Sequence, residues 1–141
     1  CGDANVVFQE SHEIAGETWH KDSSVVFDFE IGDTNTLHDF YFNLRTTSSY
    51  EWANLYVFAE IQAPNDLFNI DTVEFVLANK KGERSGRKSG SIVENNLLFI
   101  TKKRFPIAGT YALKFTQAMR QEKLGEIIDV GLRIKEVTNE G

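Results

Sequence analysis

Apolar and polar side chains alternate along much of this 141-residue chain, and the apolar positions are rich in phenylalanine. Residues 25–31 read VVFDFEI, in which every second side chain is apolar. Because successive side chains of a β-strand point to opposite faces of the sheet, this period of two predicts strands with one buried face. The side chains that we expect to point inward are Val25, Phe27, Phe29, Ile31, Phe40, Phe42, Leu44, Leu55, Val57, Ala59, Ile61, Val73, Phe75, Leu77, Tyr111, Leu113, Phe115, Ile128, Val130, Leu132 and Ile134.

Short polar turn signals separate these segments, among them GDTN at residues 32–35 and APND at residues 63–66. Only residues 117–126 are a run of good helix formers, and we expect at most one or two helical turns there. Strands joined by short polar connections favour antiparallel sheets. We therefore predict an all-β fold, an antiparallel β-sandwich of seven to eight strands with jelly-roll connectivity; a β-barrel is the alternative.

The length and composition fit one domain with its own core. A chain of this size buries roughly 70% of the surface that its unfolded form exposes. The composition, 41% hydrophobic and 26% charged, is that of a folded protein. We divide the chain into an N-terminal tether over residues 1–10 and a single β-sandwich domain over residues 11–141. No apolar run approaches the roughly 20 residues that a transmembrane helix needs.

The only cysteine of the chain is its first residue. A single cysteine cannot form an internal disulfide, so its position is more informative than its count. In bacterial lipoproteins the signal peptide is cut immediately before a cysteine, which then carries acyl chains, and Cys1 with the short polar leader after it fits that arrangement. We predict that Cys1 is a lipid attachment site; the alternative is a free thiol at the end of a truncated chain.

The charges are unevenly distributed along the chain, whose net charge is -6. Residues 1–79 hold 14 acids and two bases, whereas residues 80–141 hold 13 bases and seven acids. A basic loop stands out, formed by Lys80, Lys81, Arg84, Arg87 and Lys88. It could bind nucleic acid or keep a glycine-rich turn in water. We favour the solvated loop and expect no nucleic-acid partner, because the chain as a whole is acidic.

The sequence gives little support to an enzyme or a metal site. The three histidines, His12, His20 and His38, lack the spacing that would place two imidazoles on one metal ion. There is no nucleophile elbow and no phosphate-binding loop. The stretches GDTNT and NDLFNIDT carry oxygen ligands of the kind that calcium prefers, but Asx turns explain both. We expect no catalytic residues, no metal ion and no cofactor.

Three aromatic residues lie in a polar stretch, SSYEWANLY, rather than at inward strand positions. Tyr50, Trp52 and Tyr56 are candidates for a surface that binds a protein partner, because tyrosine and tryptophan concentrate binding energy at interfaces. Exposed flat rings on a β-sandwich also bind sugars, so a glycan is the alternative ligand. A third interpretation is that Trp52 only covers one end of the sandwich.

Several blocks of the sequence, taken in order, resemble the GldH family of gliding-motility lipoproteins of the Bacteroidetes. The similarity runs from roughly residue 10 to residue 136. Its most specific parts are Trp19 to Asp22, Asn43-Leu44-Arg45 followed by Tyr50 and Asn54-Leu55, Ala118-Met119-Arg120, and Asp129-Val130-Gly131 with Arg133-Ile134.

The resemblance implies a cell-envelope lipoprotein associated with gliding and with the type IX secretion apparatus. Cys1 stands where such a lipoprotein would be acylated, which implies anchoring to the outer membrane on its periplasmic or surface face. The family supplies no catalytic residues to transfer. We therefore expect a non-catalytic protein that docks to other envelope proteins; the alternative is a carbohydrate-binding module that uses Tyr50, Trp52 and Tyr56.

Overall fold

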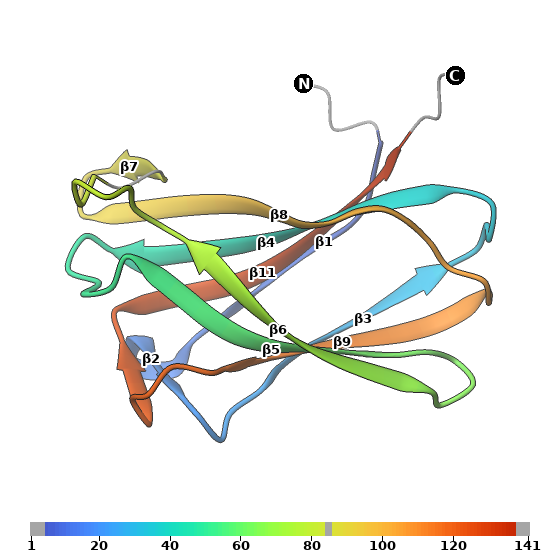
Figure 1. Cartoon of the computed structure of the whole chain (residues 1–141), viewed down its shortest axis with the longest axis horizontal. Coiled ribbons are helices and arrows are strands. Elements are labelled where there is room, and N and C mark those ends of the chain that lie inside the picture. The colour runs from blue at the N-terminus through green and yellow to red at the C-terminus, as the bar shows by residue number, and fades with distance from the viewer. Residues whose placement is uncertain (1–4, 84–85, 138–141) are drawn as a thin grey trace.

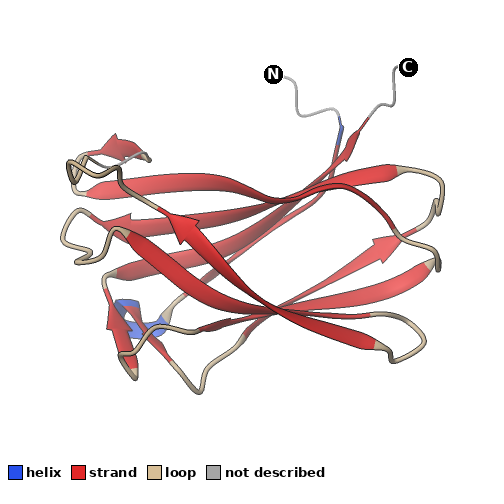
Figure 2. Ribbon diagram, in the orientation of Figure 1, coloured by secondary structure: helices blue, strands red, loops and turns tan. Residues whose placement is uncertain are grey.

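The computed structural model describes residues 5–83 and 86–137, and within these ranges the chain forms eleven strands and one short 3-10 helix (Figure 1 and Figure 2). None of the helical segments there has the length and apolar character of a membrane span. The elements are β1 (Val6–Glu13), η2 (Ala15–Glu17), β2 (Thr18–His20), β3 (Val25–Ile31), β4 (Leu37–Thr47), β5 (Asn54–Gln62), β6 (Phe68–Val76), β7 (Arg87–Ser89), β8 (Ile92–Arg104), β9 (Gly109–Gln117), β10 (Lys123–Gly125) and β11 (Ile127–Val137).

The strands form two main sheets that pack face to face, with a small third sheet at one end (Figure 1). The five-stranded sheet has the order β1-β11-β4-β8-β7, and the four-stranded sheet has the order β3-β9-β5-β6. Strands β10 and β2 make the small sheet. In both main sheets an early strand pairs with a late one, β1 with β11 and β3 with β9. Early and late segments of the chain are therefore interleaved in both sheets.

All strand pairs are antiparallel, which confirms the predicted all-β antiparallel class. The predicted number of seven to eight strands is wrong, because the described residues contain eleven. The difference comes from β2, β7 and β10, which have three residues each. A three-residue strand is too short to show an alternation in the sequence, so only the longer strands could be predicted.

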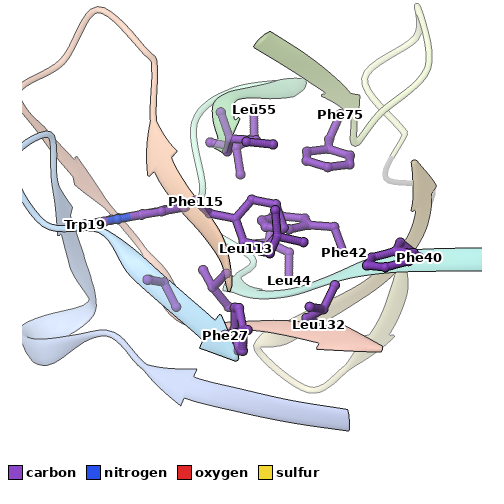
Figure 3. Packing of buried hydrophobic residues seen from close by; sticks show 14 of the residues in the cluster. Trp19, Phe27, Phe40, Phe42, Leu44, Leu55, Phe75, Leu113, Phe115 and Leu132 are labelled. Atoms are coloured by element: carbon purple, nitrogen blue, oxygen red, sulfur yellow. The ribbon is translucent and has the colours of Figure 1, made fainter. Parts of the chain in front are cut away.

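The core lies between the two main sheets and consists of the side chains that alternate inward. Strand β3 is a regular example, with Val25, Phe27, Phe29 and Ile31 buried and the residues between them exposed. Figure 3 shows how rings from both sheets meet in this layer, with Phe42 facing Phe75 and Phe115. Trp19 of β2 and Leu124 of β10 join the same cluster, so the small sheet closes one end of the core.

Aromatic rings make the central contact between the sheets. Phe42 of β4 stacks on Phe75 of β6, with ring centroids 4.3 Å apart, and meets the edge of Phe115 of β9 at 4.9 Å. Phe29 of β3 contacts Phe40 of β4 at 5.4 Å in an edge-on arrangement. Such pairs contribute about 0.5–1.5 kcal/mol beyond the burial of their surface. The phenylalanine content of the chain is therefore used to hold one sheet on the other.

The first strand begins earlier than the predicted tether allows. Residues 6–10, assigned to the tether, belong to β1, which pairs with β11 from Val6 opposite Lys135 to Glu13 opposite Asp129. The ring of Phe8 packs on Phe27 at 6.4 Å, so this strand is tied to the second sheet as well. Cys1 lies outside the described residues.

Two local predictions fail for identifiable reasons. Ile128 was expected to point inward, but a register shift between Ile127 and Asp129 places Ile127 in the core instead. Such an irregularity moves the side chains on one side of it to the other face. The helical turns allowed at residues 117–126 are not formed either. The buried amide of Gln117 donates a hydrogen bond to the carbonyl oxygen of Gln121 at 2.8 Å and holds a bend there.

The stacked contact between the sheets gives a direct test of this core. Phe42→Ala should lower the free energy of unfolding by about 3–5 kcal/mol, because the lost ring leaves a cavity between the sheets. Phe58→Ala is the matched control, since Phe58 lies on the outer face and is 43% exposed. It should cost less than about 1 kcal/mol. Urea denaturation of both variants measures the difference, and equal losses would contradict the assigned core.

Candidate functional site

The aromatic residues predicted as a binding surface do not all reach the surface. Tyr50 is only 2% exposed, and its hydroxyl donates a hydrogen bond to the backbone carbonyl oxygen of Asn54 at 2.9 Å. Its ring belongs to the core cluster. The prediction that Tyr50 is part of an exposed surface is therefore wrong, because a tyrosine ring can be buried once its hydroxyl has an acceptor.

Trp52 and Tyr56 remain accessible, at 37% and 39% exposure, so Trp52 is not a buried cover for the end of the sandwich. They line a hollow of about 710 Å³ together with Met119 and Arg120. Two contacts of the Tyr56 backbone fix this arrangement. Its amide lies 3.3 Å from the side-chain sulfur of Met119, and its carbonyl oxygen accepts a hydrogen bond from the amide of Ala118 at 2.8 Å. The fold thus joins two segments that lie about 60 residues apart in the sequence.

The outer face of the four-stranded sheet carries more apolar side chains than the sequence led us to expect. Tyr56 and Phe58 point outward from β5, and β6 adds Ile70 and Val76 beside them. Tyr56 is opposite Glu74 and Phe58 is opposite Thr72, so Val76 and Ile70 are their diagonal neighbours. We call the exposed side chains of this surface the apolar face: Trp52, Tyr56, Phe58, Ile70 and Val76.

Strand β6 is the last strand of its sheet. It pairs with β5 along nine residues, from Phe68 opposite Gln62 to Val76 opposite Asn54. Most of its side chains are exposed on both faces. An edge strand presents backbone N–H and C=O groups that can pair with another chain. The apolar face therefore ends at an edge that is chemically suited to strand addition.

The basic loop is exposed at every candidate residue that the structure describes. Lys80 and Lys81 lie in a turn that Asn79 organises, because the Asn79 side-chain oxygen accepts hydrogen bonds from the amides of Lys81 and Glu83 at 2.9 Å. Arg87 and Lys88 follow in the exposed strand β7. Arg84 lies outside the described residues. Lys80, Lys81 and Lys88 are exposed on the surface, whereas Arg87 also lines a hollow on the outer face of the five-stranded sheet, described below.

The acidic stretches considered for calcium show the turn geometry that was offered as the alternative. In GDTNT, Asp33 accepts hydrogen bonds from the Asn35 amide and the Thr36 hydroxyl, each at 2.8 Å, and these bonds lower the pKa of Asp33. In NDLFNIDT, Asn65 accepts a bond from the Leu67 amide at 3.3 Å. Across residues 5–83 and 86–137, no three His, Cys, Asp or Glu side chains lie close enough together to hold a metal ion.

A second surface, which sequence reasoning did not single out, lies on the outer face of the five-stranded sheet. A hollow of about 440 Å³ there is lined by polar side chains from all five strands, and we call it the polar hollow. Strand β1 gives Gln9 and Ser11, β4 gives Asn43 and Arg45, β7 gives Arg87, β8 gives Glu94 and Asn96, and β11 gives Asp129 and Arg133.

An ion pair forms one wall of the polar hollow. Arg45 donates to one oxygen of Asp129, Oδ2, through Nε at 2.8 Å and through Nη2 at 2.6 Å. These bonds and the charge of Asp129 raise the pKa of Arg45, and the charges of Glu94 and Glu13 add to the effect. Asp129 is only 7% exposed, which is unusual for an acid on an outer face. Its carboxylate is held in one position by the guanidinium.

Gly131 is a buried residue of β11, next to side chains that line the polar hollow. It lies between Ser11 of β1 and Asn43 of β4. A Cβ atom added at Gly131 would lie 2.6 Å from the Ser11 hydroxyl oxygen and 2.8 Å from the carbonyl oxygen of Glu10. The glycine is therefore needed for close approach of the strands.

The sequence did contain a signal for these residues, although an incomplete one. The alternation identifies Asn43, Arg45 and Arg133 as outward positions of strands, where polar side chains are ordinary. What makes them a site is that β11 lies between β1 and β4, which places side chains more than 80 residues apart next to one another. That pairing cannot be read from the spacing of residues within each strand.

Comparison with known proteins identifies the family. The chain matches the family model described as GldH lipoprotein over residues 6–134. The chain belongs to this family. It is 33% identical to the gliding motility lipoprotein GldH of Flavobacterium johnsoniae, over 95% of this chain and 87% of that protein. It is 32% identical to the gliding motility lipoprotein GldH homolog of Christiangramia forsetii, over 86% of this chain and 79% of that protein. The predicted family is confirmed.

The blocks by which the sequence resembles the GldH family fall on both surfaces. Ala118-Met119-Arg120 borders the hollow beside Trp52 and Tyr56. Asn43 and Arg45 from one block, with Asp129 and Arg133 from another, line the polar hollow. Trp19, by contrast, is buried and donates from Nε1 to the carbonyl oxygen of Ser23 at 2.8 Å, so that block has a role in the fold.

The close packing of the strands around Gly131 can be tested by one substitution. Gly131→Ala should destabilise the protein by about 1–3 kcal/mol, because the added methyl group meets Ser11 and the Glu10 backbone. Gly32→Ala is the matched control, since a Cβ atom there has no atom within 4 Å, and it should change stability by less than about 1 kcal/mol. Thermal unfolding of both variants measures this, and an unaffected Gly131→Ala would show that the strands do not approach so closely.

Proposed function

We propose that this member of the GldH family is a lipid-anchored, non-catalytic envelope protein that docks to other envelope proteins of the gliding and type IX secretion apparatus. The names of its relatives, both gliding motility lipoproteins, support the lipoprotein part of this proposal. Cys1 would carry the acyl chains, as the corresponding cysteine of a bacterial lipoprotein does. Strand β1 begins at Val6, so five residues separate the lipid from the sheet. Fully extended, they span about 18 Å at most, which keeps the domain close to the membrane surface.

The apolar face is the observation that carries the docking proposal. Aromatic and aliphatic side chains gather on the outer face of β5 and β6, where a sheet that faces only water would carry polar residues. Tyr56 and Trp52 have the chemistry of interface anchors. Glu74 and Thr72 lie between the apolar side chains, so the surface is suited to reversible contact rather than to permanent burial.

The edge of the four-stranded sheet adds a second means of contact. The backbone of β6 can accept an extended segment of a partner, while the apolar face receives the partner's side chains. Backbone pairing would give affinity, and the pattern of Phe58, Ile70 and Val76 would give specificity. The docking surface proposed here therefore comprises the apolar face and the adjacent edge of β6.

A non-catalytic role agrees with the way the polar side chains are used. Asp129, the most buried acid of the polar hollow, is engaged in an ion pair with Arg45. The side chains of Gln117 and Trp19 donate hydrogen bonds to nearby backbone carbonyl oxygens. These groups stabilise the fold, and the proposal assigns no catalytic step to them.

A carbohydrate ligand for the aromatic surface is the second candidate. Trp52 and Tyr56 are exposed rings, and Arg120 and Gln121 beside them could bind hydroxyl groups. The burial of Tyr50 removes one of the three rings on which that hypothesis was based. Trp52→Ala separates the candidates, because a saccharide ligand requires the ring whereas a protein partner also contacts β6.

The anchor is tested by labelling cells that express the full-length gene with a palmitate analogue. The wild-type protein should take up the label and fractionate with membranes. Cys1→Ala should lose both properties, because acyl chains contribute about 0.8 kcal/mol per buried methylene to membrane binding. An unlabelled wild-type protein, together with unchanged fractionation of Cys1→Ala, would remove the anchor from the proposal.

Docking is tested by placing a photo-crosslinking amino acid at Tyr56 in living cells. Leu98 is the matched control, since it is similarly exposed but lies on the outer face of the other sheet. We expect crosslinks to an envelope protein from position 56 and few from position 98. The combination Phe58→Ser and Ile70→Ser should reduce the yield at position 56 at least about tenfold, the loss that a weakened apolar contact of about 1.4 kcal/mol produces. Equal yields from both positions would contradict the assigned surface.

A further inference from the structure

The polar hollow lies on the opposite side of the sandwich from the apolar face, because each belongs to the outer face of a different main sheet (Figure 1). The docking proposal makes no use of it. Its composition is also different: the side chains that line it are charged or carry amide and hydroxyl groups. This lining determines which ligands the hollow can bind.

One row of the hollow crosses four strands and alternates in charge. Asp129 of β11 is opposite Arg45 of β4, Arg45 is opposite Glu94 of β8, and Glu94 is opposite Arg87 of β7. Guanidinium groups only donate hydrogen bonds, and carboxylates only accept them. Along this row, donors and acceptors are therefore presented in turn, about one strand spacing apart, roughly 5 Å.

The adjacent row is neutral and offers hydrogen-bonding groups to a ligand. Ser11 is opposite Gly131, Gly131 is opposite Asn43, and Asn43 is opposite Asn96. The Asn43 amide group donates to the side-chain oxygen of Asn96. That bond fixes both side chains. It does not use the side-chain oxygen of Asn43 or the side-chain amide group of Asn96, so both groups keep hydrogen-bonding capacity for a ligand. Gly131 contributes no side chain, and Ser11 and Asn43 pack closely over it.

The ion pair with Arg45 holds the carboxylate of Asp129 in an orientation suited to ligand binding. Both hydrogen bonds from Arg45 end on Oδ2, so the bonding capacity of Oδ1 is not used by that ion pair. The guanidinium also holds the carboxylate in a single orientation, which lowers the entropy cost of binding to it. A buried, oriented acceptor at Asp129 and an exposed acceptor at Glu94, on the other side of Arg45, are suited to groups that donate hydrogen bonds.

The mixed lining excludes several ligand classes. A phosphate group accepts hydrogen bonds, so it could bind Arg87 and Arg133 but would leave Asp129 and Glu94 without a donor and close to its own negative charge. An apolar ligand would leave the polar groups without hydrogen bonds, at a cost for each of them. A sugar hydroxyl both donates and accepts, so it can bridge a guanidinium and a carboxylate that lie side by side. The volume, about 440 Å³, lies in the range of small-molecule sites.

We propose that the polar hollow is a saccharide-binding site that holds one or two sugar units of an envelope glycan. In this site, Asp129 and Glu94 accept hydrogen bonds from sugar hydroxyls, and Asn96 and Arg87 donate to them. Arg45 positions Asp129 and does not need to contact the sugar. The ring lies in the hollow of about 440 Å³ between these side chains. The site gives the protein a second attachment, independent of the docking surface on the other sheet.

The test uses the whole domain on a glycan array, followed by calorimetry with the saccharides that bind. Glu94→Gln and Asn96→Ala are the test variants, because both residues are exposed and their replacement leaves the core intact. Each should weaken binding about threefold to tenfold, the effect of one lost hydrogen bond, and the double variant more. Asp28→Asn, an exposed acid on the outer face of β3, is the matched control and should bind as the wild type does.

The outcomes distinguish this site from the other proposals. Loss of binding in Trp52→Ala, with none in Glu94→Gln, would assign the saccharide to the aromatic surface and overturn the proposal. Absence of binding on the array would also overturn it, as would a crosslink from position 96 to a polypeptide. Docking is judged separately, because the crosslink yield from position 56 should be the same in Glu94→Gln and in the wild type.

Discussion

The contact between phenylalanine rings of the two main sheets is the interaction on which the other features depend. Phe42 lies between Phe75 and Phe115, and Phe29 reaches Phe40 from the opposite sheet. Each of these rings occupies an inward strand position, so all of them are buried only if every strand keeps its register. Because the register is fixed by burial, the outward side chains are fixed with it. The two outer surfaces are therefore consequences of the core.

The two outer surfaces differ in chemistry because the two main sheets contain different strands. The four-stranded sheet ends in β6, whose exposed apolar side chains continue those of β5. The five-stranded sheet places β11 between β1 and β4, so that Asp129 meets Arg45 and Gly131 meets Asn43. One side of the sandwich is thus suited to a protein partner and the other to a small polar ligand. A short connection to a lipid would hold both sides next to the membrane.

The sequence predicted the inward positions of the long strands, since alternation depends only on neighbours along the chain. The sequence does not show which strands pair with each other, and the polar hollow depends on that pairing. Ser11, Asn43 and Gly131 lie together only because distant segments of the chain pair. The sequence also misplaced Tyr50, whose burial depends on a hydrogen bond to Asn54. The extra residue of the bulge before Asp129 has no signature in the composition, and Ile128 was assigned to the wrong face for that reason. Trp52 and Tyr56 were correctly singled out as accessible rings: Trp52 lies in a polar stretch, and Tyr56 occupies an outward position of β5 between the buried Leu55 and Val57.

Hydroxyl-radical footprinting tests most directly whether the apolar face is a docking surface. Side-chain oxidation would be compared between the purified protein and the protein in intact cell envelopes. The account predicts that Trp52, Tyr56 and Phe58 lose oxidation in the envelope, while Val26 and Leu98, which are exposed elsewhere, keep it. Equal oxidation of Tyr56 and Phe58 in both samples, or protection confined to Leu98, would contradict it.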